Sequence, residues 1–325
     1  MSRRGWVLFA AMSVIWGVPY LLIKVAVGGV PVPVLVLARV GIGAALLLPL
    51  ALRQRQLGAL RPYWRWLAAF ALVEIIVPWL LLSEAERRLS SSMTGLLVAS
   101  VPIIVVVLAM LTGGTGRQTT GRQTTERVSA IRWAGLLAGL GGVALLVGPT
   151  AAGGDAWSVI EVLCVALCYA TGPLIASRKL NDLPPLEMTA VCLAFATIVY
   201  TPVAALTWPS SMPSWQVLAA LAGLAVVCTA AAFVLFFRLI AEVGPARASV
   251  ITYINPAVAV ALGVSVLGER FTLTMACAFA LILGGSVLAT RSGQPKAPVS
   301  PPQASLEPKL SPEPGPVPEP GLERA

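Results

Sequence analysis

The sequence contains no histidine, and only 11% of its 325 residues carry a charge. Soluble domains carry about 25% charged residues, so this chain has too few polar groups to cover a surface that faces water. Without histidine, neither a Ser-His catalytic pair nor a histidine-ligated metal site can be built. We therefore expect no enzyme of these classes, no metal and no cofactor.

A glycine-rich phosphate-binding loop followed by lysine and serine or threonine is also missing, which disfavours a nucleotide-driven pump. The chain has only five cysteines, all inside apolar stretches, where cysteine behaves as a small hydrophobic residue. Cys164 and Cys168 share one helix face, four residues apart, which is poor geometry for a disulfide. The remaining three are Cys192, Cys228 and Cys277.

What the chain has in abundance is long apolar blocks, and 57% of its residues are hydrophobic. A helix of about 20 apolar residues crosses a bilayer core of about 30 Å. The blocks predict an all-α integral membrane protein with ten transmembrane helices. They run approximately over 6–27, 32–52, 66–83, 91–112, 130–149, 156–177, 186–207, 215–238, 246–267 and 271–290.

The net charge of +9 comes mostly from basic residues in alternate connections between the blocks. If the N-terminus is cytoplasmic, the cytoplasmic segments hold 17 lysines and arginines and the opposite side holds 4. The positive-inside rule then places both termini in the cytoplasm. We expect the chain to lie in the inner (plasma) membrane. This rule accounts for the basic charge without a nucleic-acid partner.

Two segments are polar enough to lie outside the membrane. The cytoplasmic loop 113–129 contains a tandem copy of Gly-Arg-Gln-Thr-Thr, and the tail 292–325 holds 10 of the 26 prolines. We expect the tail to be disordered or polyproline-like. The domains are then a first five-helix repeat, 1–149, a second, 150–291, and the tail.

The two halves show a weak internal repeat at an offset of 154 residues. Pro19 falls on Pro173, Pro102 falls on Pro256, and Lys24 falls on an arginine. These prolines are expected to break the first and fourth helix of each half. Because five is an odd number, the second half is inverted relative to the first, as in many secondary transporters with a solute site near the midplane.

Several short motifs resemble those of the EamA-type family of the drug/metabolite transporter superfamily. The motifs are Trp16-Gly17 with Lys24, Arg39, Ser90 to Ser92 with Pro102, Phe237-Arg238, Gly244, Ala248-Ser249, Tyr253, Pro256 and Leu267-Gly268-Glu269. The first half departs from the pattern, since it has no Leu-Gly-Glu after its fourth helix. The resemblance implies a ten-helix alternating-access carrier of amino acids, other metabolites, drugs or sugar-linked nucleotides, often an exporter.

Charged residues inside the hydrocarbon are functional candidates because they are costly there. Arg39 and Glu74 lie deepest, at depths that differ by only about 4 Å, so we expect them to pair or to line a wet cavity. A purely structural ion pair or a protonated Glu74 remains the alternative. Lys24 and Glu161 lie about 5 and 8 Å from the outer edge, where snorkelling or local solvation explains them equally well.

Softer candidates are Trp16, Tyr169, Tyr253 and Asn255, which precede the helix-breaking prolines. Carbonyls left unpaired by those prolines could contact a solute. Asn255 is the one asparagine in an apolar block.

The leading hypothesis is a secondary transporter, with the lipid bilayer and a small solute as partners. Proton coupling through Glu74 or Glu161 and a homodimer are open alternatives. An intramembrane enzyme and a channel are the rival classes, but the sequence has no catalytic signature and no filter or charged ring.

Overall fold

The computed structural model describes residues 1–54, 56–111, 130–152 and 156–290, and all regular structure in these ranges is helical. Nine helical segments are long and apolar enough to cross a membrane, and a tenth apolar helix is shorter, Trp133–Gly148. The predicted ten-helix membrane architecture is therefore confirmed. The expected duplication loop, 113–129, and the tail, 292–325, lie outside the described residues.

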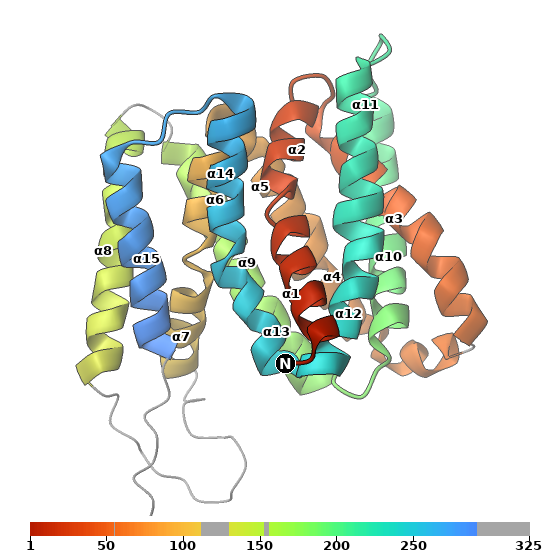
Figure 1. The fold of residues 1–325 in the computed structure, drawn as a ribbon. Helices are drawn as coiled ribbons and strands as arrows, with labels where there is room; N and C mark the ends of the chain where they lie inside the picture. Colours follow the sequence, from red (N-terminus) through yellow and green to blue (C-terminus); the bar gives the residue numbers. More distant parts are fainter. Residues whose placement is uncertain (55, 112–129, 153–155, 291–325) are drawn as a thin grey trace, which may run out of the picture. The chain divides into compact units, whose positions relative to one another are not determined.

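The first half begins with a helix in two pieces and continues through four further membrane passes (Figure 1). Its elements are α1 (Arg3–Ile15), α2 (Pro19–Ala26), α3 (Val32–Gln54), η1 (Leu57–Tyr63), α4 (Trp64–Ala71), η2 (Leu72–Ile76), α5 (Val77–Arg88), α6 (Ser91–Val98), α7 (Val101–Leu111) and α8 (Ala130–Ala152).

The second half follows the same order of passes. Its elements are α9 (Ala156–Lys179), α10 (Pro185–Leu206), α11 (Trp215–Ala222), η4 (Gly223–Ala231), α12 (Ala232–Val243), α13 (Pro245–Ala248), η5 (Ser249–Tyr253), α14 (Asn255–Leu267) and α15 (Leu273–Thr290).

Three of the four prolines mark helix breaks. Pro19 is the first residue of α2, while Pro102 and Pro256 are the second residues of α7 and α14. The prediction for Pro173 was wrong, because α9 runs unbroken from Ala156 to Lys179 through this residue. A proline inside a helix removes one hydrogen bond, and the turns on either side of it hold α9 together.

The third pass of each half contains a π-helical stretch, η2 in the first half and η4 in the second. Such stretches widen the helix by one residue and are frequent at functional sites. Glu74 lies in η2, and Thr229 lies in η4. The two halves therefore share a local irregularity that their sequences do not show.

The main contacts between the helices are similar when the two halves are exchanged. The second pass of each half packs on its counterpart, α3 on α10, and so do the fourth and fifth, α6 on α14 and α8 on α15. The third pass of one half packs on the first pass of the other: α5 contacts α9, and α11 and α12 contact α2 and α1. α1 begins and α15 ends on the same side (Figure 1). This is the pattern expected of two five-helix repeats related by a two-fold axis.

Candidate substrate and coupling site

Arg39 lies buried on α3, where both halves of the protein contribute to its surroundings. Its Nε donates a hydrogen bond to Thr229 Oγ1 on η4 at 3.1 Å, and its Cζ lies 3.6 Å from the centre of the Trp79 ring on α5. Tyr169 on α9 lies close to both Trp79 and Arg39. The site is thus a cation held on an aromatic face, with hydroxyl groups around it.

The π-helical turn explains why Thr229 is available to Arg39. Its hydroxyl donates to the carbonyl of Leu224, five residues earlier, at 2.8 Å. The same oxygen keeps a lone pair that accepts from the guanidinium. A regular α-helix would place residue 225, not 224, opposite this hydroxyl, so η4 fixes the hydrogen-bond partner.

Glu74 does not bind Arg39 in this structure. Within the described ranges, the ion pair that is formed joins Arg87 to Glu84 at 3.5 Å. Glu74 lies against α9 at Gly172, and its Oε2 is buried without a hydrogen-bond partner. A side chain at position 172 would collide with this carboxyl group. The expected pairing is absent, while the wet-cavity alternative stays a prediction.

Lys24 has a structural partner. Its Nζ donates to the carbonyl oxygens of Glu86 and Leu89, at 2.6 and 2.7 Å. These are among the last carbonyls of α5, which have no partner inside the helix. The ammonium group of α2 therefore caps the end of α5.

Sequence reasoning missed Glu86. Its side chain is fully buried, and neither carboxyl oxygen has a hydrogen-bond partner. The predicted apolar block ended at residue 83, whereas α5 continues to Arg88. Extending the helical period from Trp79 by seven residues would have placed Glu86 on the same face.

Sequence reasoning also missed what Glu269 does, although its motif was recognised. Gly268 ends α14 in the left-handed conformation, with φ of 66°, which glycine adopts without strain. Glu269 then accepts hydrogen bonds from the backbone N–H groups of Ser91 and Ser92, at 2.6 and 2.9 Å, and from the Ser92 hydroxyl at 2.5 Å. The second half thereby caps the N-terminus of α6 in the first.

The carboxyl group of Glu269 lies outside the membrane-spanning segments. Burial acts to raise its pKa, but the hydrogen bonds from Ser92 and Ser91 outweigh burial, and the pKa lies below its ordinary value. The positive end of a helix dipole favours an anion at this position. Glu269 therefore holds the two halves together best when it is ionised.

The other candidates make packing contacts. The Trp16 ring lies against Phe236 and Phe233 of α12, with centroids 4.5 and 6.2 Å apart. The Tyr253 hydroxyl lies 3.1 Å from the Thr290 hydroxyl of α15.

Asn255 and Glu161 differ in how well their polar atoms are satisfied. With its amide nitrogen facing two carbonyls, Asn255 donates to Ile251 and to Ser13 of α1, at 3.0 and 3.1 Å. Glu161 is buried on α9, and its Oε2 has no partner. Among the softer candidates, Tyr169 is the one that lies beside Arg39 and Trp79 in the described part of the chain.

The sequence and fold match known proteins over most of the chain. The inner membrane transporter YedA of Escherichia coli strain K12 is 28% identical over 286 residues, which cover 86% of this chain and 88% of that protein; YedA of the O6:H1 and O157:H7 strains matches equally. A crystal structure that is 22% identical shares the fold with a TM-score of 0.61, covering 88% of this chain and 96% of its own. The model of the EamA-like transporter family matches residues 3–148 and 156–291. Together with the ten apolar helices, this match shows that the chain is a multi-pass membrane transporter, not an enzyme, and that it belongs to the EamA-like transporter family.

Proposed function

We propose that this transporter exports a small metabolite, amino acid or drug across the inner membrane by alternating access, with both termini in the cytoplasm. The observation that carries the proposal is the buried guanidinium of Arg39, which lies where α3, α5, α9 and η4 meet. Relative movement of the halves would expose this point to one side and then to the other. Export is the direction that the family resemblance favours.

The chemistry of the cluster favours a solute with a carboxylate and an apolar or aromatic part. A guanidinium has five N–H donors, and within the described residues its hydrogen bond to Thr229 uses one of them. A carboxylate can accept two parallel hydrogen bonds from the rest. Trp79, Tyr169 and Tyr20 offer aromatic surface beside it.

Counterflow in proteoliposomes tests the assignment of Arg39. A screen of radiolabelled amino acids and other carboxylates first identifies a transported solute. Arg39→Ala then removes a charged hydrogen-bond donor worth about 1.5–3 kcal/mol, so we expect counterflow to fall by about 10- to 150-fold. Arg4→Ala, which removes the same charge at the exposed start of α1, is the control. If both variants transport normally at equal abundance, Arg39 does not bind the solute.

We propose that a buried carboxyl group couples transport to protons. Desolvation penalises a buried charge, so an acid that water reaches in only one state of the cycle binds and then releases a proton. Glu74 and Glu86 both have buried oxygens without a partner. Glu74 is the nearer to the α9 face that carries Tyr169, since it contacts Gly172.

Replacement by glutamine separates the two acids, because glutamine keeps the shape and loses the proton. Replacing the coupling residue with glutamine should abolish transport driven by a pH gradient and should leave solute exchange intact. Glu84→Gln, at a half-buried, salt-bridged position, is the control. If pH-driven transport survives in both Glu74→Gln and Glu86→Gln, neither acid couples transport to protons.

A further inference from the structure

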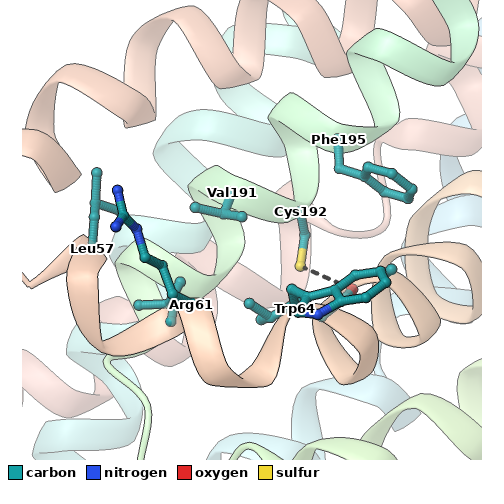
Figure 2. Close-up of a pocket in the computed structure, with 9 residues that line it drawn as sticks. Leu57, Arg61, Trp64, Val191, Cys192 and Phe195 are labelled. Carbon is teal, nitrogen blue, oxygen red and sulfur yellow. Dashed lines mark hydrogen bonds between the residues drawn. The ribbon is translucent and has the colours of Figure 1, made fainter.

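A groove lies between the short helix η1, α4 and α10, at the end of the membrane passes where α3 connects to α4 (Figure 2). Its cavity volume is about 410 Å³. Eight of the nine lining residues are apolar or sulfur-containing, and one is an arginine. They are Leu57, Leu60, Arg61, Trp64, Leu67, Ala68, Val191, Cys192 and Phe195.

The walls of this groove offer almost no polar partner. The Cys192 thiol, the polar group of the α10 wall, donates to the carbonyl of Leu67 at 3.7 Å (Figure 2). Cys192 is a buried residue of α10 that faces α4, and its neighbours Val191 and Phe195 line the groove. The interior of the groove therefore suits a hydrocarbon chain and not a hydrated solute.

The rim of the groove is basic and aromatic. Arg61 is exposed, and Figure 2 shows it on the opposite flank from the Trp64 and Phe195 rings. Two further cations lie beside tryptophans of α4 without lining the groove themselves. The Cζ of Arg65 lies 5.6 Å from the centre of the Trp64 ring, and the Nζ of Lys179 lies 4.9 Å from the Trp66 ring. Exposed tryptophans beside lysine and arginine are typical of the membrane–water interface.

We propose that this groove binds an anionic phospholipid, with an acyl chain in the apolar interior and the phosphate against Arg61. A ligand must be apolar at one end to fill the walls and anionic at the other to meet the arginine. The membrane around the groove supplies such a molecule, and basic pockets between membrane helices are suited to anionic headgroups. The bound lipid would fix η1 and α4 against α10, next to the π-helical stretch that carries Glu74.

Native mass spectrometry of the full chain in detergent tests the proposal, with phosphatidylglycerol and phosphatidylcholine of identical acyl chains as probes. Phosphatidylglycerol should bind more tightly than phosphatidylcholine. Arg61→Ala should weaken the binding of phosphatidylglycerol by about fivefold, since one basic residue near a lipid headgroup contributes about 1 kcal/mol. It should weaken the binding of phosphatidylcholine less, because the choline ammonium offsets the charge of the phosphate. Arg4→Ala, at an exposed position of α1, should change the binding of neither lipid.

The acyl-chain half of the site is tested by filling the groove. Ala68→Phe should weaken the binding of both lipids. Ala219→Phe, at an exposed position of α11, should weaken the binding of neither. Thermal melts of each variant establish that it is folded, and Arg61→Ala tests the site even if Ala68→Phe does not fold. Equal binding of the two lipids to the wild type, or equal losses in Arg61→Ala and Arg4→Ala, would overturn the proposal. Unchanged lipid binding in a folded Ala68→Phe variant would overturn it as well.

Discussion

The contact between α8 and α15 depends on glycines whose backbones touch, which allows a sharp prediction for Gly285→Ala. A Cβ atom at residue 285 would lie 2.5 Å from Gly139 N, 2.6 Å from Gly135 O and 2.7 Å from Gly139 Cα. All three atoms are backbone, so no side chain can rotate away. Favourable carbon contacts begin near 3.5 Å, so the two helices must separate by about 1 Å.

The cost of this separation is set by the contacts that it loosens. Membrane helices associate mainly through van der Waals packing, since lipid tails are as apolar as leucine. Overpacking of a tight contact costs about 1–3 kcal/mol. Because the clash in Gly285→Ala is with backbone on both Gly135 and Gly139, we expect a loss of about 2–3 kcal/mol in the free energy of unfolding.

Gly284→Ala is the matched control, one residue away on the same helix. A Cβ atom at residue 284 would meet no atom within 4 Å, and the position is exposed. Alanine in place of glycine in an exposed helix gains up to about 1 kcal/mol in water, so this variant should be neutral or slightly more stable. The two substitutions make the same chemical change and differ only in the face of α15 on which they lie.

Unfolding by SDS titration in mixed micelles, followed through the fluorescence of the nine tryptophans, measures both variants. The midpoint of Gly285→Ala should fall clearly below the wild type, and that of Gly284→Ala should not. If the two variants unfold at the same SDS fraction, the close approach of α8 and α15 does not contribute to stability.

Three further predictions concern the ends of the helices and the connections between them. Hydrogen bonds lower the pKa of Glu269 in the folded protein. Its contribution to the stability of the fold is therefore present above the unfolded pKa of about 4.3 and is lost as the pH falls through the folded pKa. Between pH 7 and pH 3, the melting temperature should drop more for the wild type than for Glu269→Gln. Lys24→Met leaves two carbonyls at the end of α5 without their donor and should destabilise the protein by about 2 kcal/mol in the SDS assay, and an unchanged midpoint would contradict the capping role. Reporter fusions at Gly154 and Ser211 should read outside and a fusion at Gly121 inside, and opposite readings at two of these sites would contradict the topology.

The membrane architecture could be predicted from the sequence because bilayer thickness constrains each helix separately. A block of apolar residues must be about 20 long to cross the core, and this requirement is local in the chain. The breaks at Pro19, Pro102 and Pro256 were predicted because proline removes a backbone donor. Pro173 removes a donor too but lies inside the unbroken helix α9, so proline alone does not decide where a helix breaks. The odd number of helices in each half follows from counting alone.

The candidate site depended on contacts between residues far apart in the chain. Depth along the helices placed Arg39 and Glu74 at similar levels, but depth does not specify the direction in which a side chain points around its helix. Only the tertiary structure decided that Arg39 faces Thr229 and Trp79, while Glu74 lies against α9.

The glycine pair on α15 shows the same division between sequence and structure. The sequence does not distinguish Gly284 from Gly285, since both are glycines in the same apolar block. The rotation of α15 against α8 leaves the first exposed and presses the second against the backbone of Gly135 and Gly139. Hydrophobicity determines that a segment crosses the membrane, whereas helix rotation is set by the close packing of many side chains at once, and so it is decided only in the folded protein.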